Sequence, residues 1–222
     1  MKEKLEHMLE DIKKDLIFMA NEVEDAMYNA LKSLEKQDKE LALEIIKADK
    51  KINLREVEIE KMILSLMALQ QPVAVDLRFM VVALKMNNDL ERIGDHSKGI
   101  AKIANKLSGE PYIKAAEEIP TLGKMARSML RDAVQAFINQ NTELAIEVRK
   151  RDDEVDDLYD KIYDNIVKTL TDNKKNIHQG VELINVCRHL ERVADLAKNL
   201  AEDVVFMKEA RIIRYGGEKN DN

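Results

Sequence analysis

Residues 90–95 read Leu-Glu-Arg-Ile-Gly-Asp, and residues 190–195 read Leu-Glu-Arg-Val-Ala-Asp, one hundred positions later. The correspondence continues outward from this motif. Three apolar positions upstream match at the same separation: Leu77 with Ile177, Val81 with Val181, and Leu84 with Ile184. Asp49 and Ile52 match Asp152 and Val155 once a three-residue difference in the linker is allowed. Self-similarity at a fixed separation indicates a duplicated structural unit.

The rest of the sequence favours long helices. Among 222 residues there are only 7 glycines and 3 prolines, so few positions interrupt a helix. Pro72, the segment 108–111 and Pro120 mark the breaks, and Asp38 and Asn141 precede periodic segments as N-cap residues do. The expected helices are six: 3–36, 39–70, 72–107, 118–140, 142–171 and 174–210.

Six helices in two related halves predict an all-α fold made of two tandem, pseudo-symmetric three-helix bundles. We place the domain boundary near Pro111, where the composition changes to a short turn-forming stretch. The first bundle is then expected over residues 1–110 and the second over residues 111–222.

Charge and cysteine content limit the environment and the partners. A formal net charge of −6 gives no overall attraction to nucleic acid, so we expect no nucleic-acid partner. The single cysteine, Cys187, cannot form an intrachain disulfide, and no apolar run is long enough to span a bilayer. With no signal peptide recognised at the N-terminus, the expectation is a cytoplasmic protein without membrane insertion.

An acidic pair ends an apolar stripe in each half. Positions 77, 81, 84, 88, 91 and 95 are spaced by 4, 3, 4, 3 and 4 residues, which places them on one face of a helix. We expect this stripe to begin as packing surface and to end with Glu91 and Asp95. The second half repeats the pattern and ends with Glu191 and Asp195.

Two carboxylates four residues apart on a helix repel each other by about 0.2–0.5 kcal/mol when exposed, and by more when water is withdrawn. A cation is therefore expected nearby. Lys98 and Lys198 follow the aspartates by about one turn and can pair with them in part. Arg92 and Arg192 point about 100° away from Glu91 and Glu191 around the helix.

The preceding helix in each half supplies more oxygen ligands. Asp49, Asn53, Glu56 and Glu60 share one face in the first half, and Asp152 and Asp156 begin the matching face in the second. If the hairpin turns near Gln71, Asp49 lies 22 residues before the turn, while positions 91 and 95 lie 20 and 24 residues after it. At a rise of about 1.5 Å per residue these groups come level.

Converging carboxylates form a hard, oxygen-rich site suited to magnesium, calcium, manganese or iron. The alternative is a solvated acidic stripe of the kind that any highly charged bundle shows. Common catalytic motifs are missing: there is no glycine-rich phosphate loop, no His-Glu-x-x-His and no nucleophile elbow. The di-iron Glu-x-x-His pattern is absent as well. We therefore expect no enzyme.

With these residues in view, the chain resembles the PhoU family. The resemblance rests on the paired Leu-Glu-Arg-Ile/Val-Gly/Ala-Asp motifs, on 76–78 (Asp-Leu-Arg) after Pro72, and on Asp152 with Asp156. It implies two three-helix bundles, a cytoplasmic homodimer, and multinuclear clusters of iron, zinc, manganese or magnesium. It also implies a negative regulator of phosphate uptake and of the phosphate-starvation response. The implied partners are the ATPase of the phosphate ABC transporter and the sensor histidine kinase of the phosphate two-component system.

Carried over by position, the resemblance implies a set of metal ligands in each half: Asp49, Glu56, Glu91 and Asp95 in the first, and Asp152, Asp156, Glu191 and Asp195 in the second. The chain departs from the family at Asn53, where an aspartate would pair with Asp49. We expect either weaker metal binding in the first half or completion of that site by Glu56. A second departure, Lys208-Glu209-Ala210 in place of a glycine, leaves the end of the last helix open.

Three functions are compatible with these residues. The first is a metal-binding regulatory adaptor, which the resemblance favours. The second is a metal-dependent enzyme acting on phosphate esters, in which clustered ions would orient water. The third is a metal-free helical scaffold whose lysines neutralise the carboxylates.

Overall fold

The computed structural model describes residues 2–109 and 111–213, and every regular element in these ranges is helical. The first half contains α1 (Lys2–Lys36), α2 (Lys39–Gln70) and α3 (Ala74–Leu107). After the 3₁₀ turn η1 (Lys114–Ala116) come α4 (Ile119–Asn139), α5 (Thr142–Lys150), α6 (Asp152–Asp172), the 3₁₀ turn η2 (Lys174–Asn176) and α7 (Ile177–Glu209).

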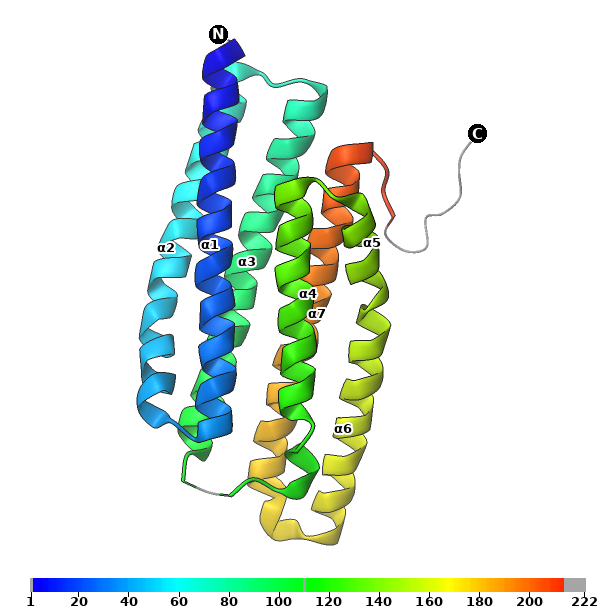
Figure 1. Ribbon diagram of the computed structural model, residues 1–222. Coiled ribbons are helices and arrows are strands. Elements are labelled where there is room, and N and C mark those ends of the chain that lie inside the picture. Colours follow the sequence, from blue (N-terminus) through cyan, green and yellow to red (C-terminus); the bar gives the residue numbers. More distant parts are fainter. Residues whose placement is uncertain (1, 110, 214–222) are drawn as a thin grey trace.

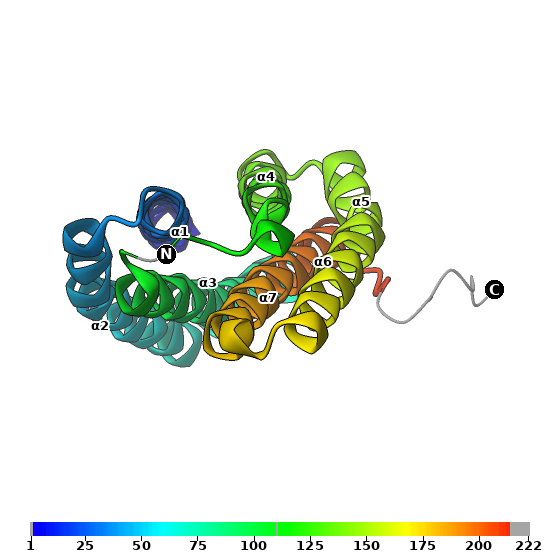
Figure 2. The same cartoon turned by 90° about the horizontal axis from the view of Figure 1, so that it is seen from below.

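The helices form two antiparallel bundles side by side (Figure 1). In the first bundle α1, α2 and α3 pack on one another, and in the second α4 and the α5–α6 rod pack on α7. Seen along the helices, α3 and α7 lie together in the middle, flanked by α2 and α6, with α1 and α4 on the opposite side (Figure 2). The all-α fold of two three-helix bundles is confirmed.

Local sequence signals explain the starts of α2 and α5. The Asp38 side chain accepts a hydrogen bond from the backbone N–H of Leu41 at 3.0 Å. Asn141 caps α5 in the same way, accepting from the N–H of Leu144 at 3.0 Å. Each cap satisfies one of the backbone donors that a helix start leaves unpaired, so both predicted N-caps are confirmed.

Two predicted boundaries were wrong. α3 begins at Ala74 rather than at Pro72, because Gln71 ends α2 in the left-handed conformation with φ 45° and the chain needs two further residues to turn back. The predicted helix 142–171 is broken at Arg151 into α5 and α6. The Arg151 side chain is held on α4 by a hydrogen bond to Asp132 Oδ2 at 2.8 Å.

The face of α3 that packs in the core differs from the predicted stripe. Met80, Ala83, Met86, Leu90 and Ile93 are fully buried or nearly so. Leu77 is 40% exposed, and its counterpart Ile177 is 47% exposed. The stripe lies at the edge of the buried face because α3 packs on α1, α2 and α7 together, which shifts its core face away from the acidic groups.

The crossing between the bundles is fixed by hydrogen bonds from α7 and from residues 111–113, which precede η1. Gln179 accepts from the N–H of Ile113 at 2.8 Å and donates to the carbonyl of Pro111 at 3.0 Å. Tyr112 donates to the carbonyl of Leu34 at 3.0 Å. The division into residues 1–110 and 111–222 stays a prediction, and Glu110 at that boundary lies outside the described residues.

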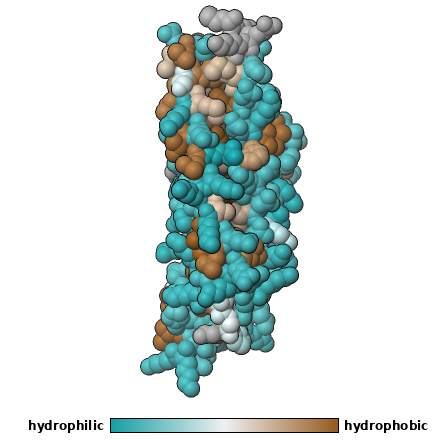
Figure 3. Space-filling view, turned by 90° about the vertical axis from the view of Figure 1, so that its left-hand side faces the viewer, coloured by the Kyte–Doolittle hydropathy of each residue, from teal (hydrophilic) through white to brown (hydrophobic). Residues whose placement is uncertain are grey.

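The surface beside α1 and α2 is mostly hydrophilic, with separate brown areas that interrupt the teal (Figure 3). Exposed apolar side chains on α2 include Leu54, Val57 and Leu64. Within the described ranges, none of the helices combines the length and the hydropathy needed to cross a membrane.

Candidate metal centres

In the first half, Lys98 ties two of the predicted ligands together. Its ammonium donates to Asp49 Oδ2 at 2.6 Å and to Asp95 Oδ1 at 3.3 Å. Asp49 comes from α2 and is buried, with a side chain only 6% exposed, whereas Asp95 on α3 is 53% exposed. The register argument therefore holds here: carboxylates from both helices reach the same height and share one cation.

Glu91 lies within the electrostatic reach of this cluster. Its pKa is raised from 4.5, first by burial and then by the charges of Asp95, Glu56 and Asp49, while Lys98 acts in the opposite direction. The pKa of Glu56 is also raised, by burial and by the charge of Glu60. All four predicted first-half ligands are thus close enough for their charges to oppose one another.

The buried side chain of Asn87, which was not among the predicted site residues, positions Glu56. Asn87 is 1% exposed, and its Nδ2 donates to the Glu56 carbonyl at 2.8 Å and to Glu56 Oε1 at 3.3 Å. Its place in the sequence, four residues before Glu91 and on the core side of α3, could have indicated that it belongs to the site. Asn53, half-buried beside these groups, has an Oδ1 with no hydrogen-bond partner among the described residues.

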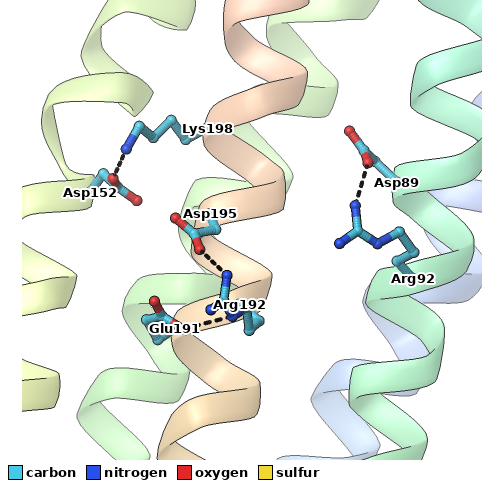
Figure 4. Close-up of polar contacts among 7 residues, drawn as sticks. All are labelled: Asp89, Arg92, Asp152, Glu191, Arg192, Asp195 and Lys198. Carbon is cyan, nitrogen blue, oxygen red and sulfur yellow. Dashed lines mark hydrogen bonds and ion pairs between the residues drawn. The ribbon is translucent and has the colours of Figure 1, made fainter. Parts of the chain in front are cut away.

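In the second half, Lys198 plays the part of Lys98. Its ammonium donates to Asp152 Oδ2, and the Asp152 side chain is only 3% exposed (Figure 4). Burial opposes the charge on Lys198, but the hydrogen bond and attraction from Asp152 raise its pKa overall. The predicted pairing of a lysine with the aspartate one turn before it is confirmed for Lys98 and Asp95. Lys198 instead contacts Asp152 on α6, and both lysines reach the neighbouring acidic helix.

Arg192 adds a second cation that was not expected to reach this cluster. It contacts Asp195 Oδ2 at 3.2 Å and Glu191 Oε2 at 3.5 Å, because its long side chain bends back along α7 (Figure 4). Arg92, its counterpart, instead contacts Asp89 Oδ1 at 3.5 Å. Sequence position alone gave the two arginines the same orientation, so their different partners are a result of the tertiary structure.

The four predicted second-half ligands also converge. Burial and the charge of Asp152 raise the pKa of Asp195, and burial followed by Asp152 and Asp195 raises the pKa of Asp156. The pKa of Glu191 is raised by burial and then by Asp195. Glu191 and Asp195 lie on the side of α7 that faces Asp152 (Figure 4). Side chains pointing into bulk solvent, remote from Asp152, would have contradicted the predicted cluster.

The small fifth residue of the motif lets the acidic helices approach. A Cβ on Gly94 would lie 3.3 Å from Ile52 side-chain atoms, so α2 and α3 are in close contact beside Glu91 and Asp95. Alanine fills this position in the second motif, where Ala194 is fully buried. The Gly/Ala position therefore supports the site through helix packing.

Two histidines meet where the bundles join. The Nδ1 atoms of His96 on α3 and His189 on α7 are 3.0 Å apart, so each ring has a partner. Burial and then the neighbouring His189 lower the pKa of His96 to about 4, and burial lowers the pKa of His189. Both rings are therefore neutral near pH 7, and they contact each other across the bundle interface.

The donor set suits a hard metal ion. The groups gathered in each half are carboxylate and amide oxygens, which favour magnesium, manganese or iron over a thiolate-preferring ion. The Oδ1 atoms of Asp49 and Asp152 are buried and have no hydrogen-bond partner among the described residues. Side chains must shift before three ligands surround one ion, since no such trio is in place within residues 2–109 and 111–213. Without metal, Lys98 and Lys198 form ion pairs with the buried aspartates Asp49 and Asp152.

Fold and sites together define a duplicated helical-bundle protein that carries one acidic cluster in each bundle. The PhoU domain matches residues 16–104 and 119–204, which together are well over half of the chain. The chain belongs to the PhoU family.

Related proteins agree over almost the full length. A phosphate-specific transport system accessory protein PhoU homolog from Aquifex aeolicus is 39% identical over 212 residues, covering 96% of each chain. The crystal structure of PhoU from Pseudomonas aeruginosa matches with a TM-score of 0.90 at 30% identity, covering 93% of this chain and 99% of that one. The phosphate transport system regulatory protein PhoU from Streptococcus pneumoniae matches with a TM-score of 0.88 at 30% identity, over 94% and 99%.

Proposed function

We propose that this protein is an accessory regulator of a phosphate-specific transport system, acting as a metal-binding adaptor and not as an enzyme. The observation that carries the proposal is one acidic cluster per bundle, on a fold shared over nearly its full length with PhoU proteins. Relatives are named as accessory and regulatory proteins, and these names describe control of transport rather than a reaction.

In this proposal the metal is held by the predicted carboxylates. Asp49, Glu56, Glu91 and Asp95 would bind it in the first half, and Asp152, Asp156, Glu191 and Asp195 in the second. Iron, manganese, magnesium or zinc would supply positive charge that neutralises the cluster. The chain's own part is to bring carboxylates from two helices to one level, where their mutual repulsion favours a cation.

The remaining parts of the proposal concern partners and place. The protein would work in the cytoplasm as a homodimer and repress phosphate uptake and the phosphate-starvation response when phosphate is plentiful. Its partners would be the ATPase of the phosphate ABC transporter and the sensor histidine kinase. The largely hydrophilic face beside α1 and α2 (Figure 3) suits reversible contacts with such proteins.

The test measures the metal content of the protein and its ability to repress a phosphate-transport promoter. Protein purified without chelator is analysed for metals by plasma mass spectrometry, beside the triple variant Asp152→Ala, Glu191→Ala, Asp195→Ala. In a bacterium that lacks its own PhoU, each version is assayed for repression of a phosphate-transport promoter and for co-purification of the transporter ATPase and the kinase. We expect the wild type to carry metal and repress, and the variant to lose both. Full repression by a variant with unchanged metal content would contradict the adaptor mechanism.

A further inference from the structure

The two acidic clusters differ in the cations that face them. In the first half Lys98 contacts Asp49 and Asp95. In the second half Lys198 contacts Asp152, and Arg192 contacts both Glu191 and Asp195. A metal ion entering the second cluster must displace two cationic side chains, whereas one entering the first must displace a lysine.

The different position of the arginines follows from the residue three places earlier. Asp89, with its side chain 13% exposed, contacts Arg92 at 3.5 Å (Figure 4). This contact takes up the guanidinium that would otherwise be free to reach Glu91 or Asp95. The matching residue in the second half is His189, whose ring contacts His96 instead. Without an acidic partner at this position, Arg192 bends back onto the carboxylates of its own motif.

The helices that precede the motifs also differ: α2 carries more carboxylates on its acidic face than α6 does. Asn53, Glu56 and Glu60 of α2 correspond to Asp156, Tyr159 and Tyr163 of α6. The two tyrosine rings stack with centroids 6.3 Å apart, so the second cluster ends in an aromatic pair where the first continues with two glutamates. The loss of one charge at Asn53 is outweighed by these two glutamates.

Arg188, which replaces Asn88, does not separate the two clusters. Its charge acts on Tyr159 of the second half, and it also lines a cavity with Asp95 and Lys98 of the first half. The difference therefore lies in the cations that contact the carboxylates directly. In the first half Lys98 contacts Asp49 and Asp95, whereas in the second half Lys198 contacts Asp152 and Arg192 contacts Glu191 and Asp195.

From this imbalance we infer that the first bundle holds the tighter divalent-cation site, and that Asp89 is a positioning residue which keeps Arg92 out of it. The inference rests on the proposed metal binding. It reverses the expectation from Asn53 alone, which was weaker binding in the first half. A unit charge a few ångströms from a divalent ion at a partly exposed site changes affinity by about tenfold or more, so the two sites should differ by at least that factor.

The experiment measures Mn²⁺ binding to the full chain by isothermal titration calorimetry and by the electron paramagnetic resonance signal of free Mn²⁺. One variant removes charge from the first cluster (Asp49→Asn with Glu91→Gln), and a matched variant removes it from the second (Asp152→Asn with Glu191→Gln). We expect two affinity classes in the wild type, loss of the tighter class in the first variant, and its retention in the second. Circular dichroism without metal checks that both variants fold.

Two further variants test the part played by the arginines: Arg192 is 53% exposed, and Asp89→Asn keeps the size of a side chain that is 13% exposed. Arg192→Gln should tighten the weaker class about tenfold, and Asp89→Asn should weaken the tighter class severalfold by releasing Arg92. Loss of the tighter class in the second-half variant, or no response to Arg192→Gln, would overturn the inference while leaving metal binding in place. Absence of any Mn²⁺ binding in the wild type would overturn both the inference and the proposed metal site.

Discussion

The contact between Lys198 and Asp152 gives the sharpest test of how the clusters are stabilised without metal. The Asp152 carboxylate is 3% exposed, one of its oxygens receives the Lys198 ammonium, and the other has no partner among the described residues. Replacing Lys198 by Met keeps most of the aliphatic packing and removes the charge. Asp152 is then left as a buried carboxylate without a cation.

The magnitude follows from the burial of the two partners. Removing one member of a fully buried pair costs about 3–5 kcal/mol. Lys198 is 33% exposed, so water screens part of the interaction and the expected loss is roughly 2–3 kcal/mol. For a chain of this size such a loss lowers Tm by about 4–12 °C.

The assay is urea-induced unfolding followed by circular dichroism, in chelator and again with Mn²⁺. Lys198→Met should lose stability in chelator and recover much of it with Mn²⁺, because the ion no longer competes with an ammonium for Asp152. Lys161→Met is the control, since Lys161 is 61% exposed and contacts Glu118 on the surface at 2.9 Å; it should change stability by less than about 1 kcal/mol. Equal stability of Lys198→Met and wild type in chelator would refute the reasoning.

Three further predictions follow from the same structure. Because burial and Asp195 raise the folded-state pKa of Glu191 above 4.5, protonation of Glu191 favours the folded state, and this contribution is lost as pH rises through the folded pKa. Glu191→Gln should therefore raise the free energy of unfolding at pH 7 in chelator and flatten its pH dependence just above pH 4.5; urea titrations across this range that coincide with wild type would argue against it. Leu90→Ala should cost about 2–5 kcal/mol because Leu90 is fully buried, measured by urea unfolding, and a loss below 1 kcal/mol would mean that the motif is not part of the core. Asp38→Ala should cost about 1 kcal/mol by removing the α2 cap, measured by thermal unfolding, with Asp38→Asn, which keeps an acceptor, as the control.

The histidine pair lies beside Asp95 of the first oxygen cluster. His96 directly follows Asp95, yet its ring is turned into the α3–α7 contact, where it meets His189. A Cβ on Gly99 would lie 2.5 Å from His189 Nε2, so glycine at this position leaves room for the ring. The histidines therefore link the bundles, and Asp95 lines a cavity between α3 and α7 together with both of them.

Periodicity and spacing were enough to predict the helices, the caps at Asp38 and Asn141, the duplication and the level at which the carboxylates meet. These features depend on rise per residue, on local hydrogen bonding and on repeated sequence, all of which can be read along one chain. Lys98 pairs with Asp95 for the same reason: a residue three positions on lies one turn away on the same face of the helix. Lys198 contacts Asp152 across the helices instead.

Tertiary structure decided what lies between helices. The exposure of Leu77 and Ile177 depends on α3 and α7 packing together, and the sequence pattern of either helix alone cannot show which neighbours it has. The break at Arg151, the hold of Asn87 on Glu56 and the contrasting partners of Arg92 and Arg192 likewise depend on contacts across long sequence separations or on flexible side chains. Which carboxylates come together could be predicted from residue spacing, because helix geometry fixes their height. Which cation pairs with which carboxylate depends on the tertiary structure, because a long side chain can reach several partners and only the packed bundles bring those partners close.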